Sequence, residues 1–132
     1  MAVTRDNNFL ITGSVDKTIK KISIPSHEVV KDFGRVSYEG IKSIHLAPDD
    51  KSLFVYDNKS ALKVIDLTDG TQGIRFPKPR ISMPAQPILI TGDGGHLFRV
   101  SSGTHLNLWN VRDKAHVFNS GPLAEIINCI CD

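Results

Sequence analysis

The chain has 132 residues, of which 40% are apolar and 23% are charged, and its formal net charge is +2. This length fits one domain, and the composition is too apolar for an intrinsically disordered chain. The small net charge does not require a nucleic-acid partner, and no apolar run reaches the ~20 residues of a membrane span. We therefore expect neither nucleic acid nor membrane among its partners.

The ends of the sequence bear on its location. The first residues, MAVTRDNNF, lack the charged and then apolar pattern of a secretory signal, so we expect a cytoplasmic or nuclear protein. Cys129 and Cys131 are too close for an ordinary disulfide if both lie in one strand. Reduced thiols, and a reducing compartment, follow from that spacing.

Taken in chain order, the expected elements repeat one block three times. Each block opens with a turn that carries an aspartate, at Asp6, Asp49 and Asp93. Each closes with an apolar or aromatic residue, at Ile22, Ile65 and Trp109. Both landmarks advance by 43 and then 44 residues, and a constant period in the low forties indicates a repeat architecture.

Each block is predicted to consist of strands. Runs of four to seven residues rich in Ile, Val, Leu, Phe and Thr alternate with Gly, Asn, Asp and Pro clusters. In the second block we expect strands over 41–46, 52–56, 62–67 and 73–76. Four short antiparallel strands per unit are typical of a β-propeller blade. The predicted fold is all-β, a single domain of about three blades, with repeats at about 3–40, 41–84 and 85–126 and a strand of the next blade at 127–132.

Three stretches resemble WD-repeat sequences. ITGSVDKTIKKISI (11–24) resembles the passage from the second to the third strand of a WD repeat, and GIKSIHLAPDDKSLFV (40–55) resembles its first two strands. LNLWN (106–110) resembles the family's Trp-Asp ending, with Asn110 in the Asp position. The chain is thus similar to divergent WD-repeat β-propellers along nearly its full length.

The departures from the family pattern concern its buried polar network. The family's Trp is present only as Trp109, and its Asp between the second and third strands only as Asp16, with Lys59 and Gly103 in the other two blocks. No Gly-His dipeptide precedes a first strand. We therefore expect the Trp–Ser/Thr–His–Asp network to be incomplete in every blade, and stability to rest on apolar packing.

Lys21 stands out among the strand residues. It occupies the position held by Val64 and Leu108 in the other blocks, which alternation places inward. Either its ammonium reaches out past an open edge, or this blade is not fully enclosed.

The sequence gives no argument for catalysis, a metal or a cofactor. The five histidines lack the spacing of a zinc site, and no nucleophile elbow is present. The glycine cluster at 92–95 precedes a predicted strand rather than a helix, so we interpret it as a hairpin turn and not as a phosphate-binding loop. We expect a chain that is not an enzyme.

The WD-repeat resemblance implies a docking face, formed by the loops between the fourth and first strands and by the turns between the second and third. The proline-rich segment 76–87 belongs to one of these loops, although its prolines could simply stiffen a long connection. The partner-contact candidates on this basis are Tyr38, Glu39, Arg80 and Met83 in the loops and Lys59 and His105 in the turns.

The number of blades raises the question of closure, because closed propellers have about four to eight. In the alignment the chain starts just after a first strand and stops on another, so it is expected to be either a section of a longer propeller or half of a head-to-tail, two-copy ring. The predicted function is a non-enzymatic protein–protein interaction scaffold. The alternatives are a phosphoinositide-binding propeller, whose Phe-Arg-Arg-Gly motif is missing (Leu97–Val100 is the nearest string), and a fragment of a propeller enzyme.

Overall fold

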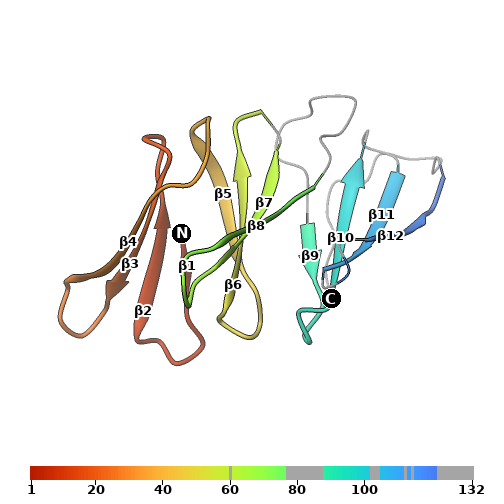
Figure 1. Ribbon diagram of the computed structural model, residues 1–132. Coiled ribbons are helices and arrows are strands. Elements are labelled where there is room, and N and C mark those ends of the chain that lie inside the picture. Colours follow the sequence, from red (N-terminus) through yellow and green to blue (C-terminus); the bar gives the residue numbers. More distant parts are fainter. Residues whose placement is uncertain (60, 77–87, 102–104, 112, 114, 122–132) are drawn as a thin grey trace. The chain divides into compact units, whose positions relative to one another are not determined.

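The computed structural model describes residues 1–59, 61–76, 88–101, 105–111, 113 and 115–121. The chain divides into two compact units, Met1–Pro77 and Lys78–Asp132, and each is described by itself. None of the described residues is helical, and the sheets of both units are antiparallel (Figure 1). The expected strand at 127–132, with Cys129 and Cys131, lies outside the described residues.

The first unit contains two four-stranded sheets, which we call blade 1 and blade 2. Blade 1 has the order β1-β2-β3-β4, with β1 Ala2–Val3, β2 Phe9–Gly13, β3 Thr18–Ser23 and β4 Val29–Arg35. Blade 2 has the order β5-β6-β7-β8, with β5 Ile41–Leu46, β6 Ser52–Asp57, β7 Leu62–Asp66 and β8 Gln72–Phe76. The strands predicted for the second block are therefore confirmed to within one residue at each end.

The start of blade 1 differs from the expectation that no first strand would be present. Ala2 and Val3 form β1, because they pair antiparallel with Ile11 and Leu10 of β2. Blade 1 thus has the same four-strand order as blade 2.

The second unit contains blade 3, in which the described strands follow the same order. These are β9 Ile88–Ile90, β10 His96–Ser101, β11 His105–Asn110 and β12 Ala115–Asn119, each paired antiparallel with the next. The all-β fold of four-stranded blades is confirmed in both units.

The repeat is visible in the pairing of individual residues. Between the second and third strands of each blade, one aliphatic residue lies directly opposite the landmark that closes the block: Leu10 opposite Ile22, Leu53 opposite Ile65, and Leu97 opposite Trp109. The sequence alignment of the three blocks is therefore the structural alignment as well.

The aspartate turns that open the blocks are also the same structure three times. The residue after the aspartate in each turn has a positive φ, 57° at Asn7, 56° at Asp50 and 68° at Gly94. Asn, Asp and Gly are the residues that tolerate this conformation best. The preceding aspartates Asp6, Asp49 and Asp93 accept backbone N–H groups at distances of 2.9–3.0 Å and so close each turn.

The core of the first unit lies between blade 1 and blade 2. Side chains from both blades and from the linker between them form it: Ile11, Ile19, Val36, Ile41, Ile44, Leu53, Val55, Ile65 and Leu67. Gly13 allows the closest approach, since a Cβ there would lie 2.8 Å from Ile41 Cγ2 and 3.0 Å from Ile44 Cγ2. Val36 and Ile41, at the two ends of the linker between β4 and β5, are part of this core.

Candidate functional site

The candidate site is built on the linker Val36–Gly40, which leads from the outer strand of blade 1 to the first strand of blade 2. Its first residue is anchored on both sides: Val36 N–H donates to the Lys17 carbonyl at 3.0 Å, and the Val36 carbonyl accepts from Lys63 Nζ at 2.7 Å. Lys17 Nζ also donates to the Tyr38 carbonyl at 2.7 Å. These bonds fix the linker backbone at the end of the blades.

Asp57 is a buried carboxylate at this end, and the sequence analysis missed it. Its side chain is 6% exposed and accepts three hydrogen bonds, from Ser37 Oγ at 3.1 Å, Lys59 N–H at 3.0 Å and Ala61 N–H at 2.9 Å. One carboxylate therefore ties the turn between β6 and β7 to the linker. A buried carboxylate is tolerated when donors surround it in this way.

The Asp57–Ser37 bond refines the expectation of an incomplete polar network. Position 59 is indeed Lys rather than the family's Asp, but Asp57 lies two residues earlier and serves the same turn. Ser37 of the linker donates its hydroxyl to this carboxylate. The available signal was an Asp directly after the predicted strand at 52–56, followed by a polar turn, since Asp commonly bonds to backbone groups two residues on.

Three of the predicted contact residues come together here. Tyr38 is 74% exposed, and the side chains of Glu39 and Lys59 form an ion pair with Nζ–Oε1 at 2.5 Å. The Lys59 ammonium holds the pKa of Glu39 below its ordinary value, and the Glu39 carboxylate raises the pKa of Lys59. Both side chains are therefore charged near neutral pH.

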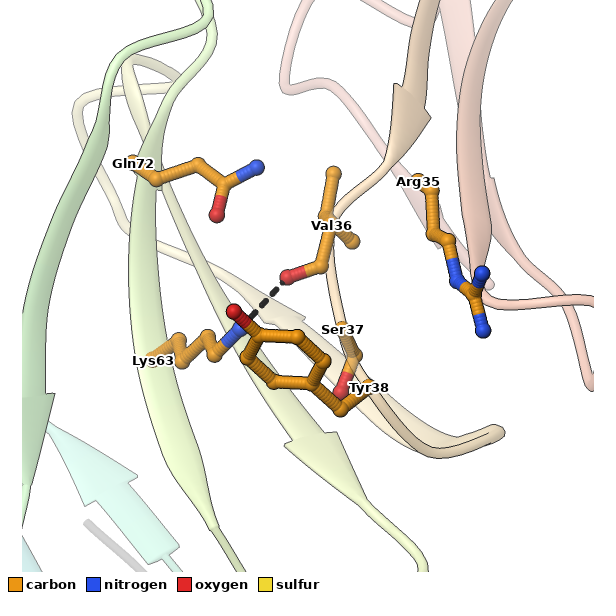
Figure 2. A pocket seen from close by; sticks show the side chains of 6 residues that line it. All are labelled: Arg35, Val36, Ser37, Tyr38, Lys63 and Gln72. Carbon is orange, nitrogen blue, oxygen red and sulfur yellow. Dashed lines mark hydrogen bonds between the residues drawn. The ribbon is translucent and has the colours of Figure 1, made fainter.

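A hollow of about 330 Å³ lies beside Tyr38 (Figure 2). Its walls are Arg35, Val36, Ser37 and Tyr38 from the linker side and Lys63 and Gln72 from blade 2. The Lys63 side chain is only 7% exposed, and its Nζ lies 5.4 Å from the centre of the Tyr38 ring. In Figure 2 the Gln72 amide points toward the same space as the Lys63 ammonium, so the hollow combines an aromatic face with polar groups.

The remaining predicted contact residues are not part of this surface as described. His105, expected in the turn between the second and third strands, is the first residue of β11 in the second unit. Arg80 and Met83 lie outside the described residues. All six residues remain predictions as partner contacts.

The described residues offer no recognisable inorganic site. Among them, no group of three or more His, Cys, Asp and Glu side chains could hold a metal ion. In the same part of the chain, no helix is long and apolar enough to cross a membrane.

The solved structures to which this chain is similar include WD40 propellers. The chain is similar to U3-55K (TM-score 0.77, 16% identity, covering 97% of this chain and 40% of that chain) and to the RRP9 WD40 repeats (TM-score 0.77, 16% identity, 97% and 39%). It is also similar to the β-propeller domain of Cps50 (Swd1) from Myceliophteria thermophila, with a TM-score of 0.73, 14% identity and coverage of 96% and 43%. No protein-family model and no curated protein matches the sequence. The chain thus spans about two fifths of the length of these propellers.

Proposed function

We propose that this chain, whose fold is that of WD40 β-propeller blades, is a non-enzymatic protein–protein interaction scaffold, either a subunit or a section of a larger complex. The likeness to WD40 structures supports the fold, and the surface of this chain supports the function. The partner is a protein or peptide that docks on the linker end of the first unit.

The observation that carries this proposal is the exposed Tyr38 on a backbone that cannot easily move. Residues that dominate protein interfaces are enriched in Tyr, Trp and Arg, and they bind best when they are already held in place. Tyr38 is such an anchor, because hydrogen bonds from Lys17 and Lys63 fix the residues around it. The adjoining hollow gives a partner side chain a recess next to the ring.

The polar surroundings fit the rim of an interface. Glu39 and Lys59 present one charge of each sign beside Tyr38, and a charged rim contributes to specificity more than to affinity. Arg80, Met83 and His105 remain predicted contacts that rest on the WD-repeat resemblance alone.

The experiment is affinity purification of the tagged chain from its native source, with quantitative mass spectrometry of the proteins recovered. We expect Tyr38→Ala to lower recovery of a specific partner about tenfold, the loss typical of a truncated anchor residue. The matched control is Phe118→Ala, because Phe118 is an aromatic side chain of the second unit that is 52% exposed. Equal recovery by the wild type and Tyr38→Ala would contradict the docking surface.

The source of the missing blades is a separate part of the proposal. Three blades do not close a ring, so the others come from additional chain or from a second copy bound head to tail. Light scattering decides between these: a monodisperse dimer supports self-association, and a monomer contradicts it. A cytoplasmic or nuclear location, and partners that include neither nucleic acid nor membrane, remain predictions.

A further inference from the structure

A second hollow, of about 520 Å³, lies at the opposite end of the strands of the first unit. It is bounded by the turns that follow β5 and β7 and by the adjoining ends of β2, β3 and β4. Its apolar wall consists of Phe9, Val30 and Leu67, and its charged groups are Lys21, Lys31 and Asp50. It is separate from the surface around Tyr38, which lies at the linker end.

The two lysines of this hollow are directly opposite each other on β3 and β4. Like charges in this position destabilise a sheet, whereas opposite charges stabilise it. The neighbouring pair on the same strands follows the usual rule, since Lys20 lies opposite Asp32 and their charged atoms are 3.8 Å apart. The Lys21–Lys31 pair is therefore an exception within its own sheet.

Among the described residues neither ammonium group forms an ion pair, although the Asp69 carboxylate interacts electrostatically with Lys31. Lys21 Nζ lies 4.0 Å from the centre of the Phe9 ring, and Lys31 Nζ donates to the Thr68 carbonyl at 2.9 Å. Asp50 accepts the backbone N–H of Arg5 at 2.9 Å and forms no ion pair with either lysine. Both ammonium groups keep protons available for an acceptor from outside.

The structure shows how the charge of Lys21 is accommodated at an inward position, which the sequence left open. Its position is the inward one, opposite Ile11, and its side chain is half-buried. The ammonium extends along the Phe9 ring to the hollow, so the charge is partly withdrawn from water. In blades 2 and 3 the same position is held by Val64 and Leu108, which shows that the fold itself does not need a charge there.

We propose that this hollow binds an acidic segment of a protein partner, in which a Glu or Asp stands next to an apolar residue. The carboxylate lies between the Lys21 and Lys31 ammonium groups, and the apolar side chain packs on Phe9, Val30 and Leu67. Two lysines against one carboxylate give charge complementarity, and the volume is in the range of sites that enclose small ligands. This site is independent of the surface around Tyr38.

The test is an NMR titration of the isotope-labelled full chain with two peptides, acetyl-Leu-Glu-Leu-amide and acetyl-Leu-Gln-Leu-amide. We expect the Glu peptide to shift the backbone amide signals of Phe9, Val30 and Leu67 and to bind about tenfold more tightly than the Gln peptide, the difference expected from one well-paired charge. Raising the salt concentration should weaken the Glu peptide selectively.

Variants on the two faces of β3 provide the control. Lys21→Gln and Lys31→Gln should each weaken the Glu peptide about fivefold and leave the Gln peptide within about twofold. Lys20→Gln removes a lysine from the other face of the same strand and should change neither.

Three results would overturn the proposal. Equal binding of the two peptides would show that the hollow does not select a carboxylate. Amide shifts confined to other parts of the chain would place the site elsewhere. Hexanoate that binds as tightly as the Glu peptide would assign the hollow to small carboxylates rather than to a protein segment. None of these results bears on docking at Tyr38, which the recovery experiment tests separately.

Discussion

Replacing Asp57 by Ala tests whether one carboxylate ties the turn between β6 and β7 to the linker that carries Tyr38. The change removes the acceptor for three donors, Ser37 Oγ and the N–H groups of Lys59 and Ala61. A hydrogen bond to a charged group contributes about 1.5–3 kcal/mol, so losing the two backbone donors alone should lower the free energy of unfolding by about 3 kcal/mol. Urea unfolding of wild type and variant, followed by circular dichroism, measures this difference.

A double-mutant cycle with Ser37→Ala isolates the link to the linker. Ser37→Ala alone should cost about 1 kcal/mol, and the double variant should cost about 1 kcal/mol less than the sum of the single changes, because both remove the same bond. Asp57→Asn serves as the isosteric control, since it keeps one acceptor oxygen for the turn. A loss below about 1 kcal/mol for Asp57→Ala, or a cycle that is additive within about 0.3 kcal/mol, would show that Asp57 does not join the turn to the linker.

Three further predictions concern the packing and the turns. Gly13→Ala should destabilise the first unit by about 1–3 kcal/mol in urea unfolding, because the new Cβ would lie 2.8 Å from Ile41 Cγ2; an unchanged midpoint would contradict this close approach. Ala47→Thr should stabilise the chain by about 0.5–1 kcal/mol, because the new hydroxyl can donate to Asp49 as Thr4 and Thr91 donate to the aspartates of the two equivalent turns. No increase in melting temperature would count against this prediction. The Thr4 hydroxyl, with the backbone and side chain of Asn8, holds the pKa of Asp6 below its ordinary value of 3.8 in the folded chain. The stability that Asp6 contributes is therefore complete above pH 3.8 and is lost as the pH falls through the lower pKa of the folded chain. Asp6→Asn should therefore reduce the acid dependence of the unfolding midpoint below pH 5, and an identical pH profile would show that this carboxylate has no such role.

The fold was predictable because its signals are local and repeated. The Asp turn, the Leu10–Ile22 type of pair and the alternation of the strands recur in each block, so one block supports the interpretation of the next. The positive φ at Asn7, Asp50 and Gly94 shows why the turn residues vary only among types that accept that conformation.

The candidate site was predictable only in part. The family resemblance indicated Tyr38, Glu39 and Lys59, and the structure brings these three residues together at one end of the first unit. The bond from Ser37 to Asp57 and the approach of Lys63 to Val36 link residues 20 and 27 positions apart. Such contacts depend on how blade 2 packs on blade 1, and no spacing within a block encodes them.

The two hollows were beyond sequence reasoning for the same reason. Lys21 was noticeable as a charge in an apolar position, but its role depends on Lys31 across the sheet and on the turn after β7. Only the pairing of β3 with β4 shows that two positive charges lie directly opposite each other and that a recess lies beside them.

The most direct test of the docking surface is photo-crosslinking with p-benzoylphenylalanine in place of Tyr38, in extract from the native source. We expect a discrete crosslinked protein that unlabelled wild-type chain competes away and Tyr38→Ala does not. The same probe in place of Phe118 should not capture that protein. Crosslinks that are absent at position 38, or that are identical at both positions, would contradict a partner surface built around Tyr38.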